Sequence, residues 1–232
     1  MITSSLVIPI FDEEENINYL FREIKESGVY DIVTDIIFIN DASTDNSKNL
    51  IEKIISTNSK VKCVNHKSNL GQSMCLKTAA NFSKNECLIT IDGDCQNNPN
   101  DIHKILDIYR SKNFGLVGGI RLKRRDPLIK ILSSRIANKV RIIILNDDCI
   151  DTGCSLKIFN RDLFLKIPHF DGIHRFLPAL FKAYGANTHF IDVDHRHRKY
   201  GRSKYDTFGR LFRGIRDIFK VLLIIKRYNK KL

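Results

Sequence analysis

Short apolar runs alternate with amphipathic segments through the first half of the chain, and this alternation restricts the fold more than any other feature. The runs are short and rich in β-branched residues, which indicates buried strands; they lie at 5–10, 35–40, 61–65 and 87–92. Segments with apolar residues at helical spacing follow them, at about 16–26, 43–55 and 72–82. Such strand–helix alternation predicts an α/β fold with a mostly parallel sheet, flanked by helices and connected by right-handed crossovers.

The second half continues the pattern less regularly. Strands are expected at 114–119, 156–159 and 188–193, and helices at 99–109 and 176–184. A basic amphipathic segment covers 127–145. We find no internal repeat and no Gly-, Pro- or Ser-rich linker, so we expect one domain over 1–205 and a tail over 206–232.

Acidic residues follow several of the predicted strands directly. Asp12 follows the first strand, Asp41 the second, and Asp92 with Asp94 the fourth. Ligands of parallel sheets bind beyond the carboxyl ends of the strands, so these side chains are expected to converge on one cleft. The alternative is three unrelated acidic turns.

The Asp92-Gly93-Asp94 sequence places two carboxylates around a glycine at the end of an apolar run. Gly93 allows a sharp turn there, and Gln96 supplies a further oxygen donor. Oxygen ligands of this kind suit Mg²⁺ or Mn²⁺, which commonly link protein carboxylates to substrate phosphates. A solvated turn between two elements is the competing interpretation.

Composition limits the class of protein. A hydrophobic content of 43% over 232 residues indicates a globular chain. The six cysteines contain no Cys-x-x-Cys pair, which argues against a disulfide framework and a zinc site. Residues 1–5 do not resemble the start of a signal peptide, and no apolar run approaches the ~20 residues of a membrane span. We therefore expect a soluble or peripheral protein.

Charge is concentrated at the end of the chain. Residues 195–232 carry 13 lysines and arginines against two aspartates, which accounts for +11 of the formal net charge of +12. From residue 206 onward, apolar residues recur at helical spacing among the basic ones, as in a helix that lies on an anionic membrane surface. The alternative is a C-terminal helix whose apolar stripe packs on the domain or on a second subunit.

Taken in order, several motifs resemble those of the family 2 inverting glycosyltransferases of the GT-A fold. The subgroup that transfers sugars to dolichyl or polyprenyl phosphate is the most similar. The matching stretches cover residues 5 to about 206 and lie at 7–16, 40–45, 69–71, 92–96, 151–154, 174–180, 195–198 and 201–205. Each motif is weak alone, but the set in this order and spacing is specific.

The resemblance implies a donor site and its cofactor. A nucleotide-sugar donor, GDP-mannose or a UDP-hexose, would be held by a nucleotide-binding group of residues: Pro9, Asp12, Glu13, Asp41, Gly71 and Asp92. The metal ligands would be Asp92, Asp94 and Gln96, holding Mg²⁺ or Mn²⁺ on the diphosphate. Phe11 and Asn40 replace the Tyr and Asp usual in the family, which leaves both guanine and uracil open as the base.

The resemblance also implies how the acceptor is held. Arg202 and Lys204 would close over phosphate, and Arg121 and Arg135 are candidates for binding the acceptor phosphate. Asp151 matches the family carboxylate near the sugar, so it is assigned with Asp94, Arg202 and Lys204 to the catalytic group, as a base or an acceptor-orienting residue. A turn or helix cap before Gly153 is the alternative role for Asp151.

The resulting interpretation is a metal-dependent transferase on the cytoplasmic face of the cell membrane, moving a sugar to polyprenyl phosphate. One alternative keeps the enzyme class but uses a glycan or glycolipid hydroxyl, which would require a general base. Two others are a nucleic-acid-binding protein and a nucleotidyltransferase. The basic residues lie beside an apolar stripe and no nucleic-acid motif is present, which argues against nucleic acid as a partner. No Gly-rich phosphate loop follows the first strand, which argues against the nucleotidyltransferase. The sequence leaves a homodimer open.

Overall fold

A computed structural model describes residues 2–112, 114–121, 138–198 and 207–230; within the last range it describes the side chains of 214 and 216–230. The described strands form one seven-stranded sheet in the order β3-β2-β1-β4-β6-β5-β7. Their bounds are β1 Ser4–Ile10, β2 Asp35–Asn40, β3 Val61–Asn65, β4 Cys87–Thr90, β5 Leu116–Arg121, β6 Lys157–Asn160 and β7 Thr188–Val193. Every predicted strand is present, which confirms the α/β class with a sheet flanked by helices.

The sheet is parallel except at one strand. The pairs β1–β2, β1–β4, β2–β3 and β5–β7 are parallel, whereas β6 runs antiparallel to both β4 and β5. As a result β6 inserts between two strands that precede it in sequence. The expected mostly parallel sheet is therefore confirmed, and β6 is its antiparallel strand.

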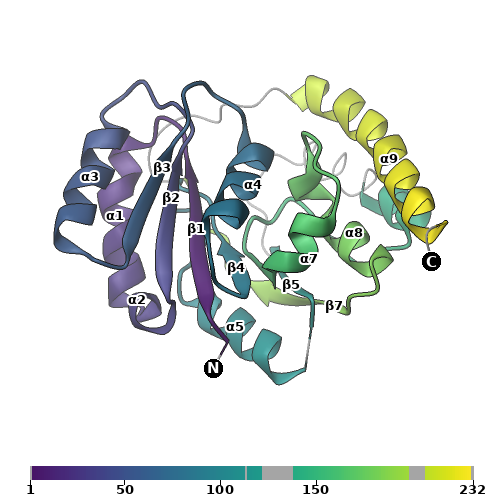
Figure 1. Ribbon diagram of the computed structural model, residues 1–232, viewed down its shortest axis with the longest axis horizontal. Helices are drawn as coiled ribbons and strands as arrows, with labels where there is room; N and C mark the ends of the chain where they lie inside the picture. The colour runs from purple at the N-terminus through teal and green to yellow at the C-terminus, as the bar shows by residue number, and fades with distance from the viewer. Residues whose placement is uncertain (1, 113, 122–137, 199–206, 231–232) are drawn as a thin grey trace.

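Helices cover both faces of the sheet (Figure 1). Their bounds are α1 Glu14–Glu26, α2 Val29–Ile32, α3 Ser47–Thr57, α4 Gln72–Phe82, α5 Asp101–Ser111, α7 Arg161–Lys166, α8 Leu177–Ala183 and α9 Thr207–Asn229, with a 3₁₀ helix η1 at Ile173–Arg175. Residues 138–145 are also helical, while 122–137 lie outside the described residues. The short helices α2, α7 and η1 were not predicted, because elements of one turn carry too little periodicity.

Strand alternation divides the core into two parts. In β1, Leu6 and Ile8 face one core, which the apolar stripes of α1, α3 and α5 complete. Val7 faces the other core, which α4, α7, α8 and Val221 of α9 complete. Side chains on a strand point alternately to opposite faces, so one apolar run of residues serves both layers.

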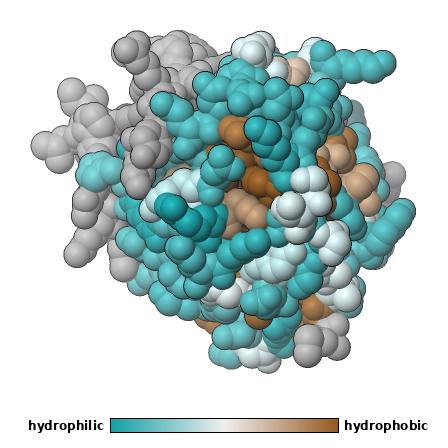
Figure 2. Space-filling view, turned by 90° about the vertical axis from the view of Figure 1, so that its left-hand side faces the viewer, coloured by the Kyte–Doolittle hydropathy of each residue, from teal (hydrophilic) through white to brown (hydrophobic). Residues whose placement is uncertain are grey.

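Two surfaces outside these cores differ in character. The face on the α3 side is mainly hydrophilic, with hydrophobic residues gathered near its centre (Figure 2).

Helix α9 packs on the domain through the fully buried Val221, yet leaves Phe219 64% and Leu223 56% exposed. Packing on the domain, one of the two predicted roles of this helix, thus accounts for Val221, while binding to a membrane stays a prediction. Among the described residues, no helix has the length and apolar content needed to cross a bilayer.

Candidate active site at the carboxyl ends of the strands

A cleft of about 270 Å³ opens where β1, β2 and β4 end. Six of the residues predicted for the donor site line it: Pro9, Glu13, Asp41, Gly71, Asp92 and Asp94. They come from four separate stretches of the chain, brought to one edge because their strands are parallel. Three of the four aspartates expected to converge, Asp41, Asp92 and Asp94, line this cleft, whereas Asp12 is not among its described lining residues.

The turns at this edge hold unusual backbone conformations. Asp12, Ala42 and Cys95 all have positive φ although none is glycine. Gly93 is required for another reason, since an added Cβ would lie 2.5 Å from Ile10 Cδ1. Strained backbone of this kind persists only where the surrounding structure holds it, and it gathers at functional sites.

The two carboxylates of the Asp92-Gly93-Asp94 turn have different partners. The Gln72 side-chain amide donates to Asp92 Oδ1 at 3.0 Å. Asp94 is buried and accepts from Arg198 Nη2 at 2.6 Å. Burial, and then the negative charge of Asp94, raise the pKa of Asp92 to about 6. Two crowded carboxylates with hard oxygen donors are a fit for a divalent cation, which would relieve their repulsion.

Gln96 lies beside this turn, with its side chain turned to a different neighbour. Its backbone N–H donates to Asp94 Oδ1 at 3.2 Å, which helps fix that carboxylate. Its side-chain amide nitrogen donates to the carbonyl of Arg196 at 3.2 Å. The metal role predicted for Gln96 remains a prediction.

Asp41 organises the loop that precedes α4. Its carboxylate accepts the backbone N–H groups of Leu70, at 2.9 Å, and Gly71, at 2.8 Å. His66 Nδ1 lies 2.7 Å from Asp41 Oδ1, and His66 Nε2 lies 2.9 Å from Thr78 Oγ1. Asp41 therefore shapes the wall of the cleft, in addition to any contact it makes with a ligand.

Cys75 completes a cluster with Asp41 and His66, whose potential ligand atoms lie within 4.8 Å of one another. Both ring nitrogens of His66 have hydrogen-bond partners, so this arrangement works as a hydrogen-bond network. The cysteine is a buried thiol, as are four of the other five, and none of the six forms a disulfide.

Asp12 and Glu13 tie the loop after β1 to the loop after β2. The Thr44 backbone N–H donates to Asp12 Oδ1 at 2.7 Å, and the Asp12 N–H donates to the Ser43 hydroxyl at 3.0 Å. The Glu13 N–H donates to the Ser47 hydroxyl at 3.0 Å. The helix expected to begin at about residue 43 begins at Ser47 instead, and residues 43 and 44 brace these two loops.

Arg121 and Asp151 were predicted to have separate roles, yet the structure pairs them. Arg121 Nε donates to Asp151 Oδ2 at 2.7 Å and Nη2 donates to Oδ1 at 2.8 Å. The backbone N–H of Arg121 adds a third contact to the same carboxylate at 3.2 Å. The loop after Asp151 returns to the Asp92-Gly93-Asp94 turn, because Ser155 donates its hydroxyl to Asn97 Oδ1 at 2.8 Å and Asn97 accepts the Asp92 N–H.

Three predicted residues, Arg135, Arg202 and Lys204, lie outside the described part of the chain. Three others that sequence reasoning missed, Gln72, His66 and Arg198, are placed by the fold at or beside the cleft. Arg198 belongs to a stretch that the motif comparison did single out, but its partner Asp94 lies 104 residues away. Only the adjacency of Gln72 to Gly71 could have indicated the role of Gln72.

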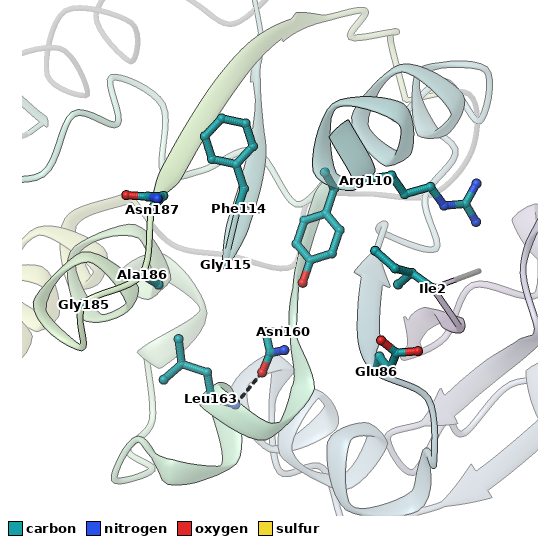
Figure 3. Close-up of a pocket in the computed structure, with 11 residues that line it drawn as sticks. Ile2, Glu86, Arg110, Phe114, Gly115, Asn160, Leu163, Gly185, Ala186 and Asn187 are labelled. Carbon is teal, nitrogen blue, oxygen red and sulfur yellow. Dashed lines mark hydrogen bonds between the residues drawn. The ribbon is translucent and has the colours of Figure 1, made fainter. Parts of the chain in front are cut away.

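A larger cavity, of about 480 Å³, lies elsewhere (Figure 3). Figure 3 shows Phe114, Asn187, Asn160, Arg110 and Glu86 around it, from the opposite ends of the strands. None of the predicted site residues lies among its described lining. The larger volume therefore does not mark the predicted site.

Comparison with known proteins points to one family. The family model described as glycosyl transferase family 2 matches residues 5–167. A dodecaprenyl-phosphate galacturonate synthase of Rhizobium johnstonii is 29% identical, over 96% of this chain and 67% of its own length. An undecaprenyl-phosphate 4-deoxy-4-formamido-L-arabinose transferase of Pectobacterium carotovorum is also 29% identical, over 87% of this chain and 62% of its own length.

Solved structures share the fold. Glucosyl-3-phosphoglycerate synthase from Mycobacterium tuberculosis, in complex with Mn²⁺, UDP and phosphoglyceric acid, aligns with a TM-score of 0.70 at 18% identity. The alignment covers 97% of this chain and 78% of that one. The GT-A fold expected from the motifs is confirmed.

Proposed function

The chain belongs to glycosyl transferase family 2, and we propose that it transfers a sugar from a nucleotide-sugar donor to a polyprenyl phosphate. The observation that carries the proposal is the pair Asp92 and Asp94 in one cleft with Glu13, Asp41 and Gly71. The two bacterial relatives named above, transferases that act on polyprenyl phosphates by name, support the choice of acceptor. The chain spans 67% and 62% of their lengths, so the acceptor is part of the proposal.

Asp92 and Asp94 are proposed to hold Mg²⁺ or Mn²⁺, with Gln96 as a third ligand. The cation would supply charge neutralisation for the diphosphate as it leaves. The solved structures named for Mn²⁺ with UDP share this fold, which is consistent with a divalent ion here. The protein itself contributes the Gln72 hydrogen bond, which fixes the orientation of Asp92.

The nucleoside is proposed to lie against Pro9, Asp12, Glu13, Asp41 and Gly71. Asp41 and Asp12 act on this surface by holding backbone loops in place, so they preorganise the cleft before a donor arrives. Both GDP-mannose and UDP-hexose remain candidate donors.

The pairing of Arg121 with Asp151 favours a phosphate, rather than a hydroxyl, as the acceptor group. A lipid phosphate is already an anionic nucleophile and needs positioning more than a base. Asp151 has both carboxylate oxygens engaged by Arg121, a group that stays protonated. We therefore assign Asp151 to orienting Arg121, which with Arg135, Arg202 and Lys204 would bind phosphate.

Helix α9 is proposed to lie on an anionic membrane surface at the cytoplasmic face. Its exposed Phe219 and Leu223 lie close in sequence to the basic residues Lys220, Lys226 and Arg227. Each cation near an anionic leaflet contributes on the order of 1 kcal/mol, so such a helix can attach the enzyme reversibly.

A donor screen with Mn²⁺ and polyprenyl phosphate in detergent tests the proposal. GDP-mannose, UDP-glucose, UDP-galactose and UDP-N-acetyl sugars are each supplied with a labelled sugar, and label in the organic phase is measured. One donor is expected to label the lipid, and the Asp94→Asn variant is expected to lose that transfer. Donor hydrolysis without lipid labelling would show that the acceptor is wrong, and absence of donor binding would contradict the transferase function.

A further inference from the structure

Arg198 lies in the candidate donor cleft beside two acidic residues. Its Nη2 donates to Asp94 Oδ2 at 2.6 Å, and its Nη1 lies 3.8 Å from Glu13 Oε1. All three residues line the cleft. The guanidinium thus already occupies one oxygen of a carboxylate proposed to hold the metal.

Backbone pairing fixes the position of this arginine. Asn97 and His195 form a β-bridge, and the Arg196 N–H donates to the Gln96 carbonyl at 2.9 Å. The Gln96 side chain donates back to the Arg196 carbonyl at 3.2 Å. The stretch that ends at Arg198 is therefore paired with the turn that carries Asp94, which makes the contact more than a chance meeting of surface side chains.

The two carboxylates of the turn are consequently unequal. Asp94 has a cationic partner at 2.6 Å, whereas the partner of Asp92 at 3.0 Å is the neutral amide of Gln72. A divalent ion that takes both aspartates has to compete with Arg198 at Asp94 only. The guanidinium displaced from Asp94 would remain in the cleft, where a diphosphate offers it a bidentate partner.

We infer that Arg198 sets the metal affinity of the donor site: it competes with the divalent ion for Asp94 and is released to the diphosphate when a nucleotide binds. This makes Arg198 a positioning residue that disfavours the metal alone and favours the metal with nucleotide. The inference rests on the proposed metal role of Asp94. If Arg198 favours the state in which metal and nucleotide are both bound, each of these two ligands raises the affinity for the other by the same factor.

The test measures Mn²⁺ dissociation constants by calorimetry, without nucleotide and with saturating UDP or GDP. Arg198→Gln is expected to bind Mn²⁺ alone about tenfold more tightly than the unmodified chain, because a competing charge at a partly buried carboxylate is gone. The enhancement by nucleotide is expected to shrink by about the same factor. Arg196→Gln is the matched control, since Arg196 pairs with Glu23 at 2.5 Å and loses the same charge from the same stretch.

Equal Mn²⁺ affinity in Arg198→Gln and the unmodified chain, or equal tightening in Arg196→Gln, would overturn the inference. Asp94→Asn distinguishes an error in the metal assignment of Asp94 from an error in the role of Arg198. If Asp94→Asn binds Mn²⁺ as well as the unmodified chain does, the metal assignment itself is wrong. If it loses Mn²⁺ while Arg198→Gln changes nothing, only the role of Arg198 is wrong. Arg198→Met replaces Arg198→Gln if circular dichroism shows that the latter is unfolded.

Discussion

Arg121 and Asp151 form a two-pronged ion pair at the end of β5, with donor–acceptor distances of 2.7 and 2.8 Å. The side chains are only 13% and 6% exposed, so the pair is largely removed from water. A pair in this setting stabilises chiefly by avoiding an unpaired buried charge. It also orients the guanidinium that we propose to face the acceptor phosphate.

Arg121→Leu is therefore expected to lower the free energy of unfolding by about 3 kcal/mol, because it removes the guanidinium that contacts both oxygens of the buried Asp151 carboxylate. Urea unfolding measures this. Combining it with Asp151→Leu is expected to cost less than the sum of the two single changes. Additive costs would show that the two side chains do not stabilise the fold as a pair.

Asp94→Asn is expected to reduce sugar transfer at least about a hundredfold. The proposed metal loses a carboxylate ligand, and the metal would otherwise stabilise the charge on the leaving diphosphate by several kcal/mol. The fold is expected to persist, because the amide keeps the shape and can still accept from Arg198. Initial rates at saturating Mn²⁺, with circular dichroism as the control for folding, test this. Full activity in the variant would rule out the proposed metal ligand.

Gln72→Ala is expected to weaken Mn²⁺ binding by about tenfold or more, because residues that orient a metal ligand typically contribute that much to affinity. Gln72 donates to Asp92 Oδ1 at 3.0 Å. Ser68→Ala provides a control at an exposed position of the loop that precedes α4. An unchanged dissociation constant in Gln72→Ala would mean that the hydrogen bond does not orient Asp92.

The raised pKa of Asp92, about 6, predicts an unusual pH dependence for the metal-free protein. The folded pKa exceeds that of an unfolded aspartate, about 3.9, so the folded state binds more protons in between. The contribution of Asp92 to the free energy of unfolding is therefore fully present below about pH 3.9 and decreases as the pH rises. It is lost above about pH 6, where the buried carboxylate must be ionised.

Ionising the buried Asp92 at neutral pH costs about 3 kcal/mol of folding stability, and Asp92→Asn removes that cost. The Tm of the variant in EDTA is thus expected to exceed that of the unmodified chain above about pH 7, and the two are expected to converge toward about pH 4. A constant Tm difference across this range would contradict the pKa assignment. Below about pH 6, protons also compete with Mn²⁺, so metal affinity should fall on acidification.

Replacing Phe219 and Leu223 of α9 by serine is expected to weaken binding to vesicles containing anionic lipid by about tenfold or more, since both apolar side chains are exposed. Vesicle co-sedimentation measures this. Phe82→Ser, which changes a side chain that is 44% exposed on α4, serves as the control. Deleting 207–232 would be a poorer test, because it removes the buried Val221 and exposes the domain beneath it. Unchanged sedimentation of the double variant would contradict the membrane assignment of α9.

Much of the fold was predictable because its signals are local. The runs at 5–10, 35–40 and 87–92 are short, apolar and β-branched, and such runs form buried strands wherever helices can cover both faces. The acidic turns that follow them lie at one edge of a parallel sheet by geometry alone. The convergence of Asp41, Asp92 and Asp94 on one cleft could thus be predicted from their positions in the sequence.

Side-chain partners could not be predicted in the same way. Arg121 meets Asp151 across 30 residues and Arg198 meets Asp94 across 104, and no local periodicity encodes either pairing. The antiparallel insertion of β6 creates the first contact, since it brings the loop that ends at Leu156 back beside β4 and β5. The β-bridge between Asn97 and His195 creates the second.

Short-range patterns of apolar and acidic residues thus suffice to place Asp41, Asp92 and Asp94 at one edge of the sheet, because each follows a parallel strand. The basic partners of the acidic residues follow from no such pattern. They depend on the order and direction in which distant segments pack, and the contact between Arg198 and Asp94 forms only when those segments have packed.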